Sequence, residues 1–290
     1  MLRVATLNAG SLFEPDWTDR RHEVVAWLDH LDADIVCLQE IWESPTEANT
    51  AAWLVDRAAR DWHWVFGGCR LDGAGRPDAV TFGSAILSRW PIDHHELIPL
   101  PVDAAPARQK AGFTMALELV HARTAGIDVF STHLAPPPEQ AYHRITQVQF
   151  IDEAIRSRQD VTSLLPPILC GDFNAEPDSD EIRFLSSLAT IDGTSTYYQD
   201  AWRATGTTEP GFTWDSLDNP LAADMHLPPK RIDYVFVGDP YGRPEGAGLV
   251  IGADLAFHEP ITGCVASDHY GLVVDIRWPQ RGHTERATRP

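Results

Sequence analysis

The sequence predicts an α/β protein made of layered strands and helices. Short apolar runs rich in Val, Ile and Phe recur along the 290 residues, and two segments between them place apolar residues at helical spacing. Clusters of Gly and Pro separate the runs, and no internal repeat is present. With 43% hydrophobic residues, the chain can bury a substantial core.

The expected strands are short apolar runs bounded by turn residues. They are Arg3–Leu7, Ile35–Gln39, Ser84–Leu87, Thr114–Leu119, Asp128–Thr132, Ile168–Cys170, Asp233–Val237 and Leu272–Ile276. Because no polar linker divides these strands, we expect one domain over residues 1–279. Residues 280–290 are almost entirely polar and are expected to form a flexible tail.

Two amphipathic helices are expected, at Glu23–Leu31 and Tyr142–Ile155. Their apolar residues recur every three or four positions, so each helix can cover one face of a sheet. Two segments dense in Gly, Pro and Asp, Leu71–Ala79 and Ser216–Lys230, are expected to be loops. Either loop can shape a substrate cleft.

The formal net charge of −19 disfavours broad binding of nucleic acid, because the whole molecule repels a polyanion. No segment rich in Lys and Arg offsets this charge. A compact acidic site that holds a cation still attracts a phosphate group locally. The charge therefore limits the size of a phosphate substrate and leaves the chemistry open.

The cysteines and the N-terminus favour a cytoplasmic protein. Cys37, Cys69, Cys170 and Cys264 are widely separated, so we expect free thiols, and no paired-cysteine spacing indicates a zinc site. The first residues, MLRVATLNAG, lack the basic and apolar regions of a signal peptide. No apolar run reaches the roughly 18 residues of a membrane-spanning helix.

Polar side chains lie at the ends of five expected strands, where α/β folds usually place their sites. They are Asn8 in VATLNAG, Glu40 in DIVCLQEIW, His133 in DVFSTHLAP, Asp172 and Asn174 in PPILCGDFNAEP, and Asp268 and His269 in CVASDHYGL.

Glu40 and the GDFNAEP motif are the most informative of these. A carboxylate after a buried strand is costly unless it is paired or binds a cation, so Glu40 indicates a metal ligand. Gly171 permits close approach of the backbone just before the polar turn. Taken alone, Asn8 is also compatible with an ordinary turn before Gly, and His133 with a structural histidine.

Together, the ordered motifs LNAG, LQEIW, STHL, GDFNAEP, RIDYVF and SDHYG resemble the endonuclease/exonuclease/phosphatase (DNase I-like) superfamily. The resemblance covers the chain from Asn8 to His269. It implies a four-layered α/β sandwich, in which two mostly antiparallel sheets pack face to face with helices outside. It also implies a divalent-metal-dependent phosphoesterase that uses an activated water.

The resemblance assigns metal binding to three residues, with Glu40 as the principal ligand, helped by Asn8 and Asp268. Oxygen ligands of this kind favour Mg²⁺ or Mn²⁺.

It also assigns the catalytic groups. His269 is expected against the scissile phosphate, where it either accepts a proton or stabilises charge, and Asp233 of RIDYVF is expected to orient it. Asp172 is expected to align or deprotonate the attacking water, and Asn174 to donate to a phosphate oxygen. His133 is expected near the leaving group.

The residues alone leave several roles open. Asp233 is also compatible with a surface ion pair with the adjacent Arg231. Ser267 can orient its neighbours or belong to an ordinary turn, and Arg144 can reach a site carboxylate or lie on a solvated face. Trp214, in a TWD segment similar to that of sphingomyelinase-like and tyrosyl-DNA phosphodiesterase members, can stack on a substrate or pack in the core.

We expect a small or terminal phosphodiester, or a phosphomonoester, as the substrate. His133 stands where apurinic endonucleases of the family have a tyrosine, which points away from that branch. A nuclease acting on DNA or RNA is the alternative, and a non-catalytic binding module on the same fold is a further one. No Gly-x-Ser-x-Gly motif supports a serine hydrolase.

Overall fold

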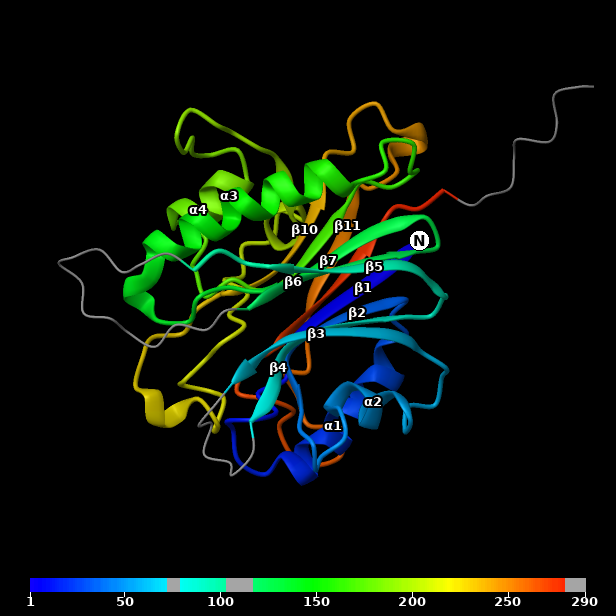
Figure 1. The fold of residues 1–290 in the computed structure, drawn as a ribbon. Helices are drawn as coiled ribbons and strands as arrows, with labels where there is room; N and C mark the ends of the chain where they lie inside the picture. The colour runs from blue at the N-terminus through cyan, green and yellow to red at the C-terminus, as the bar shows by residue number, and fades with distance from the viewer. Residues whose placement is uncertain (72–78, 103–116, 280–290) are drawn as a thin grey trace, which may run out of the picture.

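Two six-stranded sheets form the centre of the molecule. The computed structural model describes residues 1–71, 79–102 and 117–279 (Figure 1). The first sheet has the order β11-β12-β1-β2-β4-β3, and the second has the order β5-β6-β7-β8-β10-β9. The strands are β1 Leu2–Asn8, β2 Ile35–Glu43, β3 His63–Leu71, β4 Val80–Ser88, β5 Ile92–Pro99, β6 Glu118–Thr124, β7 Ile127–His133, β8 Ile168–Asp172, β9 Tyr198–Asp200, β10 Asp233–Gly238, β11 Val250–Ala256 and β12 Gly271–Ile276.

Helices cover the outer faces of the two sheets. Figure 1 shows α1 and α2 beside the first sheet and α3 and α4 beside the second. The helices are α1 Trp17–Leu31, α2 Thr50–Val55, α3 Ala141–Arg158, α4 Asp180–Leu185 and α5 Ala201–Ala204, with 3₁₀ turns at Pro138–Gln140, Ala223–Met225 and Pro244–Gly246. The expected four-layered α/β sandwich is confirmed. None of the helices in the described ranges is long and apolar enough to cross a membrane.

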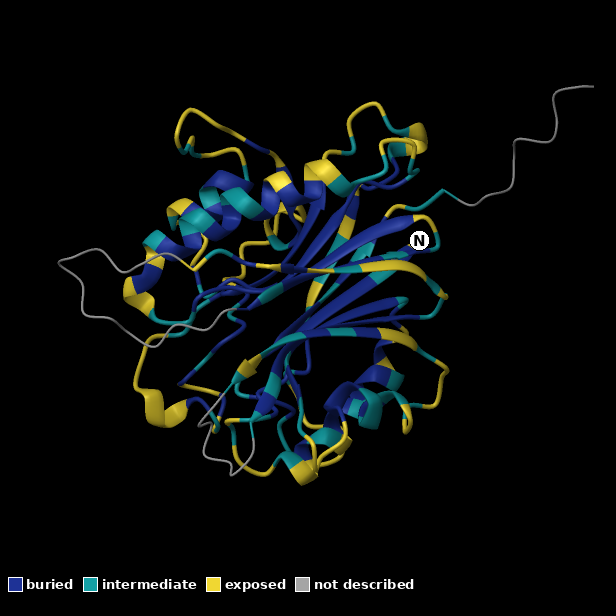
Figure 2. Cartoon of the chain, viewed as in Figure 1, coloured by how far each residue is buried: buried dark blue, intermediate teal, exposed yellow. Residues whose placement is uncertain are grey.

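One hydrophobic core lies between the sheets, where alternate residues of each strand meet. It contains Leu2, Val4, Ile35 and Cys37 from the first sheet and Val129, Ile168, Cys170 and Val235 from the second. The intervening residues Ala5, Leu7, Val36 and Leu38 face α1 and α2 instead. Figure 2 shows that the central strands of both sheets are buried almost throughout. All four cysteines are free.

The pairing directions bring the motif residues to one end of the sandwich. β1 with β2 and β7 with β8 are parallel pairs, whereas the other neighbouring strands are antiparallel. In register, Asn8 pairs with Gln39, and both His133 and Asp233 pair with Asp172. The C-terminal ends of β1, β2, β7 and β8 therefore lie at the same end of the sandwich as the N-terminal ends of β10 and β12.

The strands that sequence reasoning missed are the four sheet edges, namely β3, β5, β9 and β11. An edge strand has one neighbour and tolerates polar side chains, so its pattern is weak. In β5, for example, Asp93, His94 and His95 are all exposed.

Other boundaries also differ from expectation. The expected strand Thr114–Leu119 was misplaced, because β6 begins at Glu118 and continues to Thr124; residues 114–116 lie outside the described ranges. Helix α1 begins at Trp17, well before Glu23, since its first turns carry mainly polar residues. Residues 72–78 and the expected tail 280–290 also lie outside the described ranges.

Candidate active site

The motif residues surround a cleft of about 450 Å³ at the end of the sandwich described above. The predicted site residues that line it are Asn8, Glu40, His133, Asp172, Asn174, Asp268 and His269. Asp233 is fully buried and contacts His269 from behind. A larger hollow of about 690 Å³, lined by Trp90 and Trp278, brings together no such set of titratable groups.

A β-bulge turns Glu40 into this cleft. Along β2, Cys37 faces the core between the sheets and Leu38 faces α1, so regular alternation would also direct Glu40 toward the helices. The pairing of β2 with β4 shifts between Leu38 and Ile41, and Glu40 takes a positive φ of 58°. The Ser11 hydroxyl donates to the Glu40 carbonyl and holds this conformation. The bulge therefore re-aims the carboxylate toward Asn8.

Asn8 joins the carboxylates of both sheets. Its Nδ2 donates to Glu40 Oε1 at 3.1 Å and to Asp172 Oδ2 at 3.0 Å. Its Oδ1 accepts from the backbone N–H of Gly10 at 3.1 Å. In this orientation the amide nitrogen, not the oxygen, faces Glu40, so Asn8 positions carboxylates here and would have to turn to ligate a cation.

Asp268 faces Glu40 across the cleft beside Ser267. The Ser267 hydroxyl contacts the Asn8 carbonyl at 2.7 Å and Asp268 Oδ1 at 3.1 Å, and it accepts from the His269 backbone N–H at 3.2 Å. Ser267 therefore contacts three neighbouring groups, an arrangement that supports the orienting interpretation over an ordinary turn.

The His269 imidazole and the Asp233 carboxylate form a buried pair. His269 Nδ1 lies 2.9 Å from Asp233 Oδ2, and the backbone N–H of Asp233 donates to Thr213 Oγ1 at 3.0 Å. Burial alone would lower the pKa of His269, but Asp233, Asp268 and Asp172 outweigh it and raise the pKa well above its usual value. The three carboxylates therefore favour the protonated form of His269.

The free edge of His269 faces two more carboxylates across a gap. Its Nε2 lies 3.9 Å from Asp172 Oδ2 and 3.8 Å from Asp268 Oδ2. These distances exceed hydrogen-bond length, so Nε2 is available to a group that enters the cleft.

Asp172 is held at the end of β8 by a close-packed turn. A side chain at Gly171 would place Cβ only 1.9 Å from the Thr132 carbonyl oxygen, so glycine is required there. Asn174 has a positive φ of 48°, and its backbone N–H donates to Asp172 Oδ1 at 2.8 Å. Its Nδ2 donates to the Leu134 carbonyl at 3.2 Å and keeps a second hydrogen for another acceptor.

His133 completes the cleft as a second imidazole. Its Nε2 lies 3.5 Å from Asp172 Oδ2. Burial lowers the pKa of His133, despite the neighbouring Asp172. The pKa values of the two histidines beside Asp172 thus shift in opposite directions, because His269 also has Asp233 at hydrogen-bond distance from its ring.

The donor set fits a hard divalent cation. Burial, reinforced by Asp268, raises the pKa of Glu40 to about 8 even though Asn8 donates to it. This elevated pKa means that neighbouring groups do not compensate the Glu40 charge, as expected where a cation belongs. Asp172, Asp233 and His269 also offer atoms within 4.8 Å of one another, but Asp233 Oδ2 and His269 Nδ1 already contact each other.

Two residues at the site were missed from the sequence, Glu14 and Arg20. Glu14 lines the cleft, and burial together with Asp268 raises its pKa. Arg20 is 2% exposed and donates to the carbonyls of Gly10 at 2.7 Å and Ala266 at 2.8 Å, so it joins the loops that carry Asn8 and Asp268. Neither follows an apolar strand, so no motif signal could have found them.

The structure corrects both interpretations of Arg144. It reaches no site carboxylate and does not lie on a solvated face. It is 5% exposed, pairs with Glu181 at 2.9 Å and donates to the Ala135 and Pro137 carbonyls, which anchors the proline-rich loop after His133.

Arg231 is likewise not the surface partner of Asp233. It forms a buried bidentate pair with Asp200 at 3.0 and 2.8 Å, which leaves Asp233 to His269.

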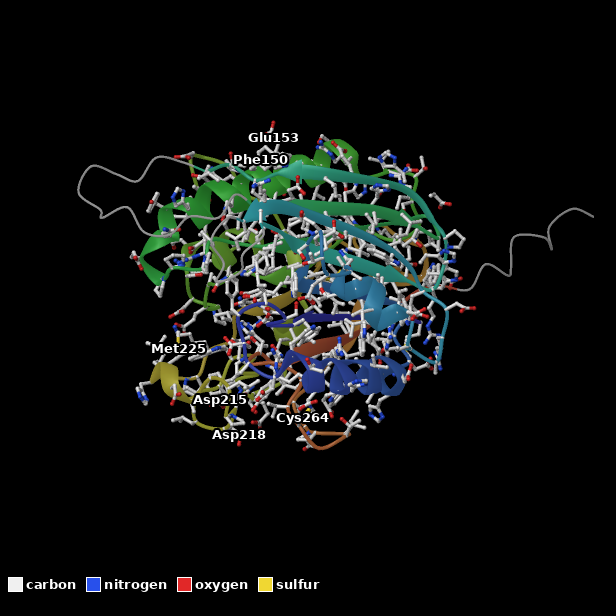
Figure 3. The ribbon with its side chains drawn as sticks, turned by 60° about the horizontal axis from the view of Figure 1, so that its bottom comes forward. Phe150, Glu153, Asp215, Asp218, Met225 and Cys264 are labelled. Carbon is white, nitrogen blue, oxygen red and sulfur yellow. The ribbon has the colours of Figure 1, made fainter. Side chains whose placement is uncertain are left out.

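Trp214 and the loop 216–230 form one wall of the cleft. Trp214 is 6% exposed and packs against Ala222 and Ile232, yet it also lines the cleft. Lys230 Nζ lies 5.9 Å from the centre of its ring. Met225, labelled in Figure 3, and Leu227 extend this wall, so the loop shapes the cleft as expected.

A model of the Endonuclease/Exonuclease/phosphatase family matches residues 5–269. The chain belongs to this family. Membership confirms the family expected from the motifs.

The curated relatives are longer proteins. Protein angel homolog 2 of Homo sapiens is 26% identical over 173 residues, which cover 58% of this chain and 31% of that protein. The Danio rerio protein of the same name is 28% identical over 181 residues, which cover 59% of this chain and 30% of that protein. The aligned region thus spans less than a third of these relatives.

Solved structures share the fold over nearly the whole chain. D. rerio TDP2 complexed with a single strand DNA product has a TM-score of 0.69 at 20% identity and covers 96% of this chain and 99% of that one. An endonuclease/exonuclease/phosphatase family protein from Leptotrichia buccalis has a TM-score of 0.67 at 17% identity, covering 96% and 100%.

Proposed function

We propose that this protein hydrolyses a phosphodiester or phosphomonoester by attack of water, with Mg²⁺ or Mn²⁺ held by Glu40 and Asp268. The observation that carries the proposal is the convergence of these carboxylates and the Asp233–His269 pair on one cleft. Asn8 keeps Glu40 in place through its 3.1 Å hydrogen bond. The metal ion, when bound, would neutralise charge on the phosphate and position its oxygens.

His269 and Asp172 take the central roles at the phosphate. His269 Nε2 points into the cleft as a cation, so it binds a non-bridging oxygen and stabilises negative charge that grows in the transition state. Asp172 Oδ2 is within reach of the same space and orients the attacking water or accepts its proton. With both groups fixed by buried partners, the site is preorganised for in-line attack.

Asn174 and His133 assist on either side of Asp172. The second Nδ2 hydrogen of Asn174 is directed to a phosphate oxygen. His133, kept neutral by burial, can donate a hydrogen bond toward the leaving-group oxygen.

We propose a small or terminal phosphoester as the substrate. The cleft of about 450 Å³ suits one phosphate group with a compact substituent, and the net charge of −19 opposes a long polyanion. The wall formed by Trp214, Met225 and Leu227 favours a substituent with an apolar or aromatic face.

A nuclease acting on an end of DNA or RNA is the second candidate. The flat Trp214 ring beside Lys230 offers a base-stacking surface next to one phosphate contact. The fold is shared with TDP2, which was solved with a single strand DNA product. A non-catalytic binding module is the third reading, and the retention of every motif residue weighs against it.

Two further expectations belong to this proposal. Because both sheets supply site residues, we propose that residues 1–279 act as one domain. The four free thiols support a reducing compartment, and we propose the cytoplasm.

A substrate panel tests the function. Bis(p-nitrophenyl) phosphate, p-nitrophenyl phosphate, a single-stranded oligonucleotide and supercoiled plasmid should be assayed with Mg²⁺, with Mn²⁺ and with EDTA. We expect turnover of a small ester that requires metal. Equal turnover in EDTA, or no turnover of any phosphoester, would contradict the proposal.

A further inference from the structure

A second cluster of metal-binding side chains lies on β5 and β6, away from the cleft. One ring nitrogen of His94, one of His121 and a carboxylate oxygen of Glu96 lie within 4.8 Å of one another. His94 and Glu96 are two residues apart on β5 and so share a face, and Glu96 pairs directly with His121 of β6. The His94 and His121 ring centres are 6.0 Å apart.

His121 is prepared as a ligand. It is 2% exposed, stacks on Phe130 at 4.4 Å, and its Nε2 lies 2.9 Å from Asp128 Oδ1. Because this contact holds a proton on Nε2, the other nitrogen, Nδ1, carries the lone pair. Nδ1 is buried without a hydrogen-bond partner among the described residues. A carboxylate behind one ring nitrogen and a free lone pair on the other is the usual arrangement of a metal-bound histidine.

The surrounding charges leave room for a cation. Arg158 donates to both Glu96 oxygens at 2.7 Å, and Arg123 donates to both Asp128 oxygens at 2.9 Å. Each carboxylate oxygen has a second lone pair, so these contacts do not exhaust Glu96. Asp160, 3.7 Å from Arg123, adds a third carboxylate against two guanidinium groups, and the cluster stays negative.

The cluster is separate from the phosphoesterase cleft and open to solvent. Asp128 lies near the start of β7, whereas His133 ends the same strand at the cleft. Arg158 is the last residue of α3, which lies on the outer side of this sheet (Figure 1). His94 is exposed, so an ion can enter from solvent.

We propose that His94, Glu96 and His121 bind a zinc-class transition-metal ion, with His121 ligating through Nδ1 and Asp128 holding its Nε2. Two imidazoles and one carboxylate favour such an ion over Mg²⁺, which prefers oxygen ligands alone. Three protein ligands leave a fourth position of a tetrahedral ion to water. This proposal is independent of the activity proposed for the cleft.

Cobalt(II), a spectroscopic stand-in for zinc, tests the site in the full chain. Calorimetry and visible absorption should be compared for the wild type, His94→Ala and His95→Ala. His95 is the matched control, because it is an exposed histidine of the same strand that points to the opposite face. All three proteins keep the cleft, so cobalt bound there contributes equally to each.

We expect the wild type and His95→Ala to bind one more cobalt ion than His94→Ala does. If His94→Ala still binds this ion, its affinity should be roughly tenfold or more lower. Asp128→Asn should lower the cobalt affinity of this site by about 10- to 100-fold. If His94→Ala bound cobalt as His95→Ala does, there would be no such site. An affinity unchanged in Asp128→Asn would overturn the assignment of Nδ1 as the ligand.

Discussion

Asn8 Nδ2 lies 3.0 Å from Asp172 Oδ2, so a single amide links the end of β1 in one sheet to the end of β8 in the other. The same nitrogen is 3.1 Å from Glu40 Oε1. The carboxylate expected to bind metal and the carboxylate expected to guide water therefore share one hydrogen-bond donor. Their spacing depends on how the two sheets pack.

Asn8→Ala should loosen this link and weaken metal binding. Without the amide, two carboxylates lose a buried donor, which costs about 1–3 kcal/mol of stability. We expect Mn²⁺ affinity to fall by about 10- to 100-fold, as for other groups that hold a ligand in place. Urea unfolding and Mn²⁺ titration measure the two effects. Unchanged Mn²⁺ affinity would show that Asn8 does not position Glu40.

Glu40→Gln should abolish most metal-dependent turnover. The substitution keeps the shape of the side chain and removes the charge that attracts the cation. Glu43→Gln is the matched control on the same strand, since Glu43 accepts from Asn49 and does not line the cleft. Mn²⁺ titration and turnover should separate the variants, and equal loss in both would point to a structural effect.

Asp172→Asn and His269→Ala should each lower kcat by about 10²- to 10⁴-fold while the fold survives. Both side chains face the same point of the cleft, with 3.9 Å between His269 Nε2 and Asp172 Oδ2. Because they serve one step, the double variant should lose much less than the sum of the two free energies. Circular dichroism controls for unfolding. If the two losses of free energy were fully additive, the two residues would not act in the same step.

Acid should destabilise the protein partly through Asp128. Burial alone would raise the pKa of Asp128, but hydrogen bonds from His121, the Asp160 backbone and Arg123 outweigh it and lower the pKa. A lowered carboxyl pKa stabilises the fold above the unfolded value of about 3.9, and this stabilisation is lost as the pH falls further. Urea unfolding between neutral and acid pH should show a shallower acid loss for Asp128→Asn. If the free energy of unfolding fell equally steeply with acid in both proteins, Asp128 would not contribute to this loss.

Activity on a small ester should depend little on salt once metal is saturating. A long duplex would need several Lys or Arg contacts, and log K would then fall by roughly one unit per neutralised phosphate for each unit of log salt. Rates on bis(p-nitrophenyl) phosphate and on plasmid should be measured across salt concentrations. Efficient plasmid nicking with a steep salt dependence would favour the nuclease candidate instead.

The central strands and the chemistry at their ends could be predicted from the sequence. β1, β2, β7, β8, β10 and β12 are mostly apolar, because both of their faces are largely buried. Polar residues that interrupt such runs, such as Asp172 after Ile168–Cys170, have to be compensated by a partner or a cation, and that requirement is local. The edge strands could not be predicted, since partial exposure weakens their pattern.

Tertiary structure alone decided which side chains meet. Without its bulge, Glu40 would face the helices. The bulge is a shift in the register of β2 against β4 after Leu38, so it depends on the pairing of two strands. Arg144 and Arg231 found partners in Glu181 and Asp200, which lie on other elements far along the chain. The spacing of apolar residues along the sequence indicates which residues are buried. The hydrogen-bond partner of a buried polar residue depends instead on how elements distant in the sequence pack.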